Sequence, residues 1–307
     1  MAAKKKGIHI HLYHWQLFAL VFLLITILAI FGIYQTNFYA FSVHRNEIKE
    51  LQQQTVPQDI KGASVATSSA SESFFPQQTF RVPILMYHYV EYVKDKGDTI
   101  RISLNITPFT FEEEIKTLIG AGYTFMTNAE LADVLDKKTT LPAKPILLTF
   151  DDGYRDFYTD VLPILKKYHV KATAYIIPGF LNKPNNLLDD QVKDIVQSGL
   201  VEIGAHTVHH VWLKGRSLKD VTDEVSLSKT MLEQQFHIAV VSFAYPYGAF
   251  DSQAVRVVKS VGFTSAVSTA PGIQESRANR FFLFRLRPGG RTGQALLDFL
   301  DKQTFQQ

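Results

Sequence analysis

The stretch "PILLTFDDGYRDF", residues 145–157, places an apolar run directly before two adjacent carboxylates, Asp151 and Asp152. The run 146–148 is typical of a buried strand. Desolvation and mutual repulsion both raise the free energy of two neighbouring carboxylates at such a place. A cation bound beside them would offset this cost, so the pair suggests a cation site where the strand ends.

From about Thr79 onward, apolar runs alternate with amphipathic segments. The pattern predicts strands at 80–90, 145–150, 171–178, 201–206, 239–248, 263–269 and 280–288, and helices at 110–123, 157–169, 188–199, 218–236, 251–262 and 292–301. In the first of these helices we expect Thr110 as the N-cap, with Glu113 three residues on. This alternation favours an α/β fold with a parallel sheet covered by helices, closed or nearly closed into a barrel of about seven strands.

The N-terminal region contains an uncharged apolar run at 17–34, preceded by Lys4, Lys5 and Lys6. Roughly 18 apolar residues can span a bilayer, and positive charge before the span keeps that end in the cytoplasm. We therefore expect a cytoplasmic tail at 1–14, a transmembrane signal anchor at 15–36, an extracytoplasmic spacer at 37–78 and an extracellular folded domain at 79–307. A cleaved signal peptide is the alternative, although no clear small-residue cleavage site follows the run.

The composition limits the kinds of site and partner that the chain can have. The chain of 307 residues has no cysteine, which excludes disulfides, thiolate metal ligands and cysteine nucleophiles. Its net charge of +3 is too small to indicate binding to nucleic acid. Any metal ion must therefore be held by histidine, aspartate or glutamate.

Polar clusters stand at or near the carboxyl ends of four of the predicted strands. These clusters are Tyr87–His88, Asp151–Asp152, His206–His210 and Tyr245–Gly248. In parallel barrels the chemistry gathers at the carboxyl ends of the strands. The four clusters are therefore expected at one end of the barrel.

The cluster His206–His210 has the spacing of a metal site. On a helical turn, His206 and His210 would share one face, and His206 with His209 is an alternative pair. A surface pair without a ligand is the simpler interpretation of such histidines. One aspartate with two histidines would leave a coordination position open for water, as catalytic sites do.

Three motifs in order resemble the polysaccharide deacetylases of carbohydrate esterase family 4. The motif T-F-D-D-G stands at Thr149–Gly153, H-[S/T]-x-x-H ends at His210, and Y-P-x-G stands at Tyr245–Gly248. The resemblance covers about 80–290 and implies a distorted (β/α) barrel. The Tyr87–His88 pair is most similar to deacetylases of poly-N-acetylglucosamine exopolysaccharides.

The resemblance also implies roles for the motif residues. Asp152, His206 and His210 would bind one divalent metal ion, with Zn²⁺ expected and Co²⁺, Ni²⁺ or Fe²⁺ as alternatives. Asp151 would be the general base that activates water. The backbone N–H of Tyr245 would help to stabilise the oxyanion.

The chain departs from the family pattern in two places. No histidine follows His237, so the usual late general-acid histidine is missing, and His88 is our candidate, with core packing as the alternative. The usual arginine upstream of the third motif is also not evident. We expect Arg280, Arg285 or Arg287 to orient Asp151 in its place. The residues proposed to contact sugar are Tyr154, Tyr247, Trp212, Arg285 and Arg287, and each of the three aromatic residues could instead serve packing.

Together these features predict a membrane-anchored, metal-dependent hydrolase that removes N-acetyl groups from a glycan. An extracellular N-acetylglucosamine exopolysaccharide is the first candidate substrate, peptidoglycan the second and chitin oligomers the third. A glycan-binding pseudoenzyme of the same fold is the rival hypothesis, supported only by the missing late histidine. A metallopeptidase is disfavoured because H-E-x-x-H is absent.

Overall fold

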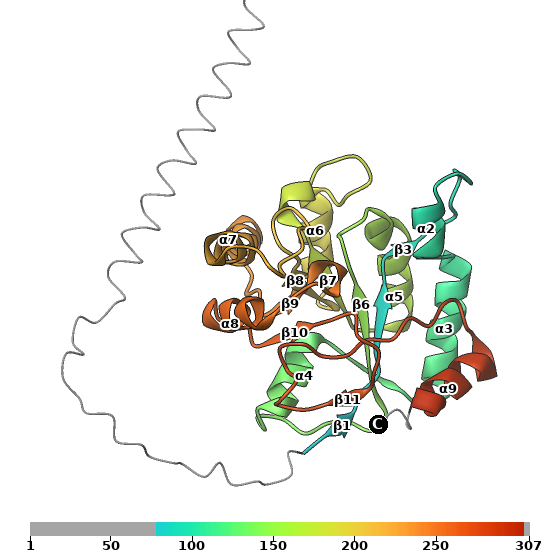
Figure 1. Ribbon diagram of the computed structural model, residues 1–307. Coiled ribbons are helices and arrows are strands. Elements are labelled where there is room, and N and C mark those ends of the chain that lie inside the picture. The colour runs from blue at the N-terminus through green and yellow to red at the C-terminus, as the bar shows by residue number, and fades with distance from the viewer. Residues whose placement is uncertain (1–77, 304–307) are drawn as a thin grey trace, which may run out of the picture. The chain divides into compact units, whose positions relative to one another are not determined.

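The computed structural model describes residues 78–303 and shows an α/β domain in which helices surround a curled parallel sheet (Figure 1). The predicted tail, signal anchor and nearly all of the predicted spacer lie outside the described residues. Among the helices within 78–303, none has the length and apolar character needed to cross a bilayer.

The strands are β1 (Phe80–Arg81), β2 (Ile84–Tyr87), β3 (Tyr89–Val90), β4 (Asn105–Ile106), β5 (Thr124–Met126), β6 (Pro145–Phe150), β7 (Ala172–Ile176), β8 (Val201–Ala205), β9 (Ser242–Ala244), β10 (Ser265–Val267) and β11 (Gln274–Glu275). The α-helices are α2 (Thr99–Ser103), α3 (Pro108–Gly120), α4 (Asn128–Leu135), α5 (Leu162–Tyr168), α6 (Asp189–Gln197), α7 (Leu218–Phe236), α8 (Ser252–Ser260) and α9 (Gly293–Lys302). Three short helical turns complete the list: the π-turn η1 (Phe157–Val161) and the 3₁₀ turns η2 (Pro178–Phe180) and η3 (Pro246–Gly248).

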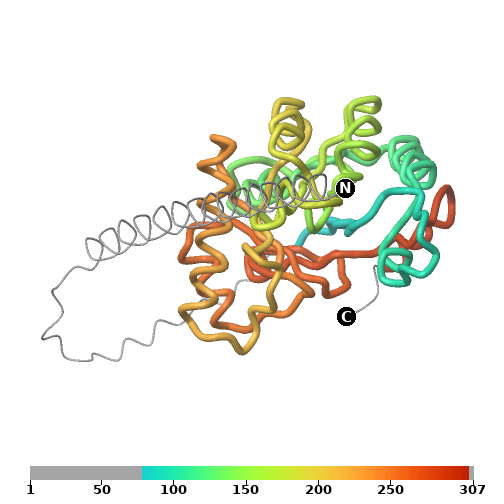
Figure 2. Tube along the Cα trace, turned by 90° about the horizontal axis from the view of Figure 1, so that it is seen from above, coloured from blue at the N-terminus to red at the C-terminus, as the bar shows by residue number. Residues whose placement is uncertain are grey.

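The main sheet has seven strands, in the order β10-β9-β8-β7-β6-β2, with β5 paired to the start of β6. All of its ladders are parallel. Its two edges are joined by the segment 283–286, because Leu283 bridges to Val267 of β10 and Leu286 bridges to Leu85 of β2. Figure 2 shows this red C-terminal segment running beside the cyan N-terminal strand. The sheet is thus a distorted barrel whose seam consists of single bridges.

In β6 and β7, side chains alternate in direction, as the two-residue period of a strand requires, and the apolar ones belong to two separate clusters. In β6, Leu147 belongs to the smaller cluster inside the curl, whereas Ile146 and Leu148 belong to the larger one beneath the helices. The same alternation places Tyr175 of β7 inside and Ile176 outside. Residues that continue this inward series past the strand ends therefore face the mouth of the barrel.

The predicted elements at 145–150 and 218–236 coincide with β6 and α7. The predicted strand 80–90 is instead three short strands, because Pro83 cannot donate to a ladder and β1 pairs with β11 while β2 pairs with β6. The N-cap of α3 is Thr107, not Thr110: its side chain accepts the Thr110 amide, and proline occupies the first helical position. The predicted strand 280–288 makes two isolated bridges and no ladder.

Candidate active site

The carboxyl ends of β6 and β8 bring three potential metal ligands together. The Oδ1 atom of Asp152 lies 3.3 Å from Nε2 of His206 and 3.1 Å from Nε2 of His210. One ligand atom from each residue fits within 4.8 Å of the others, which is the only such group of three among the described residues. The alternative pairing of His206 with His209 does not occur, because His209 turns away to Glu224.

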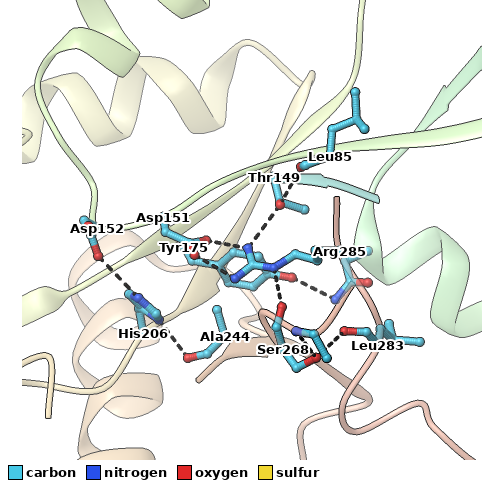
Figure 3. Close-up of polar contacts among 12 residues, drawn as sticks. Leu85, Thr149, Asp151, Asp152, Tyr175, His206, Ala244, Ser268, Leu283 and Arg285 are labelled. Carbon is cyan, nitrogen blue, oxygen red and sulfur yellow. Dashed lines mark hydrogen bonds and ion pairs between the residues drawn. The ribbon is translucent and has the colours of Figure 1, made fainter. Parts of the chain in front are cut away.

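The donor set suits a divalent cation. Oδ1 of Asp152 is buried and has no hydrogen-bond partner among the described residues, although both imidazole nitrogens are near it. The Nδ1 atom of His206 donates to the carbonyl of Ala244 at 2.7 Å, so its Nε2 lone pair faces the aspartate (Figure 3). A buried carboxylate oxygen beside the Nε2 atoms of two histidines is the arrangement expected of residues that share a metal ion.

The loop that carries the histidines is not the helical turn that we predicted. Residues 206–210 form a bend, in which Thr207 and His210 have left-handed φ angles of 59° and 55°. The spacing of four still brings both imidazoles to one place, with ring centroids 5.0 Å apart. Non-glycine residues rarely adopt this conformation, so neighbouring contacts must hold it.

Asp151 lies next to the cluster but pairs with a different cation. Its two carboxylate oxygens each accept a 2.7 Å hydrogen bond from the guanidinium of Arg285, which is 1% exposed. Arg285 is held in turn by the carbonyl of Ser268 and the hydroxyl of Thr149 (Figure 3). Burial opposes the charge on Asp151, but the ion pair with Arg285 outweighs it and lowers the pKa of this carboxyl.

The other two predicted arginines lie elsewhere. Arg280 pairs with Asp136 and with the carbonyl of Thr264, so it does not orient Asp151. Arg287 is exposed. Partial desolvation of its guanidinium lowers its pKa, and the nearby charges of Asp151 and Asp152 oppose that shift. The complete burial of Arg285 leaves it no surface with which to contact a sugar, so the substrate-binding role that we predicted for it does not fit this structure.

His88 continues the inward series of β2 and is partly buried near Asp151. Burial lowers the pKa of its imidazole, while the charges of Asp151 and Asp152 act in the opposite direction. His88 therefore lies close enough to Asp151 and Asp152 for their charges to act on its imidazole.

Tyr245 does not offer the group that we expected of it. Its amide donates to the carbonyl of Val267 at 3.3 Å, which occupies the N–H assigned to the oxyanion. Its side chain is buried and stacks on Phe250, and burial raises the pKa of the phenol. The structure thus gives Tyr245 a place in the core beneath the site.

Exposed aromatic side chains lie next to the metal-ligand cluster. Tyr247 is 58% exposed and its ring centroid is 4.5 Å from that of His210. Trp212, 60% exposed, lies 5.7 Å from Tyr247. Tyr154 stacks on Tyr89, with ring centroids 3.8 Å apart. Burial raises the pKa of the Tyr154 phenol, and the charge of Asp152 raises it further.

Sequence reasoning missed the contacts that support these groups. Thr149 and Ser268 hold Arg285, and Glu224 of α7 binds the loop between the two histidines. Thr149 stands inside the T-F-D-D-G motif, which could have pointed to it. Nothing in the sequence pairs Glu224 with a loop that precedes it by 14 to 18 residues.

The chain is similar in sequence to known deacetylases. The polysaccharide deacetylase family pattern matches residues 138–266. YxkH of Bacillus subtilis, assigned to the polysaccharide deacetylases, is 30% identical over 222 residues, which are 72% of this chain and 76% of YxkH. The poly-β-1,6-N-acetyl-D-glucosamine N-deacetylase of Staphylococcus aureus is 27% identical over 195 residues, covering 59% of this chain and 67% of that protein.

Solved structures of the same kind share the fold. The Streptococcus pyogenes deacetylase PplD, in complex with acetate, superposes with a TM-score of 0.67 and 30% identity over 74% of this chain and 99% of PplD. The polysaccharide deacetylase BC0361 of Bacillus cereus gives a TM-score of 0.63 and 27% identity over 73% of this chain and 69% of BC0361.

Proposed function

The chain belongs to the polysaccharide deacetylase family and is a hydrolase of amide bonds, and from this premise we propose that it removes N-acetyl groups from an extracellular N-acetylglucosamine polysaccharide with the help of one divalent metal ion. Asp152, His206 and His210 hold the ion, and Zn²⁺ is the first candidate because a carboxylate and two imidazoles suit it. The observation that carries the proposal is the convergence of these three side chains within 4.8 Å beside an Asp151 that remains outside the cluster.

Two protein groups move protons in this reaction. Asp151 takes a proton from the water whose oxygen attacks the acetamide carbonyl carbon. The C–N bond then breaks, and His88 gives a proton to the departing amine, so that acetate and a free amine are released. Arg285 keeps Asp151 charged and oriented, and each carboxylate oxygen retains a second lone pair for the incoming proton. When bound, a divalent cation supplies Lewis-acid activation of the water and of the carbonyl.

The exposed aromatic rings support a glycan as the substrate. Trp212 and Tyr247 form an apolar surface next to His210, and aromatic faces of this kind suit the apolar faces of sugar rings. Similarity to a poly-β-1,6-N-acetyl-D-glucosamine deacetylase favours an exopolysaccharide over peptidoglycan and chitin oligomers. The uncharged run 17–34 supports attachment of the enzyme to the cell membrane with this domain outside.

Acetate release tests the proposed reaction. The purified chain is incubated with poly-N-acetylglucosamine oligomers, peptidoglycan and chitin oligomers, after chelation and after the return of Zn²⁺, Co²⁺, Ni²⁺ or Fe²⁺. We expect release that stops on chelation, returns with a metal ion and is fastest with the poly-N-acetylglucosamine oligomers. Release that persists after complete removal of metal would refute the metal dependence, and no release from any glycan would favour the pseudoenzyme.

The general-acid role of His88 is tested by replacing it with alanine. We expect His88→Ala to lower kcat about 10²–10⁴-fold with zinc affinity unchanged, because His88 is not part of the ligand cluster. His169→Asn is the matched control: His169 is an exposed histidine at the left-handed C-cap of α5, a position that asparagine also accepts. If His88→Ala turns over as fast as this control, the assignment is wrong.

A further inference from the structure

The turn between His206 and His210 has an unfavourable backbone conformation, which contacts with other parts of the chain must stabilise. Thr207 and His210 both have left-handed backbone angles, and no glycine is available at either position. Such residues persist only where the surrounding structure fixes them. The orientation of His210 toward Asp152 therefore depends on whatever contacts the residues between 206 and 210.

One carboxylate makes most of these contacts. Oε2 of Glu224 accepts the amide of Val208 at 2.9 Å and the amide of His209 at 3.0 Å. Oε1 of the same residue accepts a hydrogen bond from Nδ1 of His209 at 2.7 Å. Glu224 lies in the second turn of α7, a helix of 19 residues that packs on β8, so the acceptor is fixed to a rigid element.

A second element closes the turn from another side. A Cβ atom on Gly179, in η2, would lie 2.2 Å from the carbonyl oxygen of Val208. The backbone of η2 thus approaches the turn as closely as glycine permits, and α7 also packs against η2. The turn is held between the carboxylate of Glu224 and the backbone of Gly179.

We propose that Glu224 is a positioning residue of the metal site, whose carboxylate holds the 207–210 turn so that His210 can share a metal ion with Asp152 and His206. The inference rests on the proposed metal-binding role of these three residues. His209, which the sequence made a possible ligand, serves instead as the third contact of Glu224, and this explains its position away from the cluster. Loss of the carboxylate lets the turn relax and withdraws His210.

The test is zinc affinity of the full chain, measured by titrating the chelator-stripped protein against a chromogenic zinc chelator. We expect Glu224→Ala to weaken zinc binding about 10–100-fold, the range found when outer contacts of metal ligands are removed. Glu224→Gln retains an oxygen that can accept both backbone amides, so its affinity should remain closer to wild type than to Glu224→Ala. His209→Ala loses only the side-chain contact and should weaken binding less than Glu224→Ala.

The matched control is Asp223→Ala, which removes a neighbouring carboxylate of α7 whose partner is the surface residue Lys219. It should bind zinc as wild type does. Should Glu224→Ala fail to fold, Glu224→Asp is measured instead, because its shorter side chain draws the carboxylate away from both amides and should still weaken binding. Wild-type affinity in the folded alanine or aspartate variant, or equal weakness of Glu224→Gln and Glu224→Ala, overturns the proposal. A wild-type chain that binds no zinc would refute the metal site itself, which is a separate result.

Discussion

Two adjacent carboxylates are tolerated here because their side chains face different partners. Asp151 faces into the barrel and pairs with Arg285, while Asp152 has a left-handed φ of 75° that turns it toward the histidines. The two neighbouring side chains therefore face an arginine and a pair of histidines, respectively. This separation is what the proposed roles require, with Asp152 as a metal ligand and Asp151 as the base.

The buried ion pair can be tested through stability. Arg285→Met would leave the charge of Asp151 buried without a partner, and we expect a loss of about 3–5 kcal/mol in the free energy of unfolding. The double variant Arg285→Met/Asp151→Asn removes both charges and should recover most of that loss. Urea unfolding of the metal-free proteins measures both changes. A double variant no more stable than Arg285→Met alone would contradict this account.

At the level of single residues, the sequence motifs identified the proposed metal ligands and base better than the residues that hold them in place. Asp151, Asp152 and His206 follow predicted strands, so the topology alone brings them to one end of the barrel. Arg285 was one of three candidate arginines, because a sequence does not tell which side chain of an irregular segment will point inward. Glu224 could not be found, since two of its three contacts are with backbone amides, which nearly every residue has.

Among the secondary-structure elements, α3 and β2 share a buried polar pair beneath the site. The hydroxyl of Tyr87 donates to Oε2 of Glu114 at 2.8 Å, and both residues lie in the core. Burial raises the pKa of Glu114 to about 8. The side chain is therefore protonated at neutral pH in the folded protein.

This raised pKa predicts that stability depends on pH. From the ordinary value of 4.5 up to about 8, the unfolded chain has lost the Glu114 proton while the folded protein keeps it. The stability from this residue is therefore complete below pH 4.5 and falls by at most about 1.4 kcal/mol per pH unit as the pH rises toward 8. Glu114→Gln cannot ionise, so we expect it to gain stability relative to wild type as the pH rises.

Urea midpoints at pH 5, 7 and 9 measure the effect. Glu113→Gln, a change to the neighbouring residue of α3 that pairs with Lys116 near the surface, is the control and should follow wild type. A difference between Glu114→Gln and wild type that stays constant with pH would exclude the raised pKa.

The elements predicted well are long and strongly patterned, as α7 and β6 are. Those that were missed are short or pair unusually: α2 has five residues, β4 two and β5 three. The helix expected at 157–169 begins with the π-turn η1, and α5 starts just before Pro163, whose ring cannot be accommodated further into an α-helix. Such details depend on tertiary contacts that periodicity does not record.

For the whole molecule, the described elements all belong to the compact unit that begins at Phe74. We predict that the fragment 74–307 releases acetate from soluble oligomers as fast as the full chain, because the proposed catalytic groups all lie within it. Only the full chain should sediment with membranes, since only it contains the apolar run 17–34. Fractionation of expressing cells, with acetate assays of each fraction, checks both statements. A full chain found in the soluble fraction would refute the anchor.

The segment that joins the two sheet edges also delivers Arg285 to Asp151. During synthesis this segment leaves the ribosome after every strand of the main sheet. An incomplete chain can thus assemble much of its sheet and its histidines while one acidic side chain still lacks its counter-charge. If Asp151 is the base as proposed, a chain that ends before Arg285 should release no acetate even where its histidines are in place.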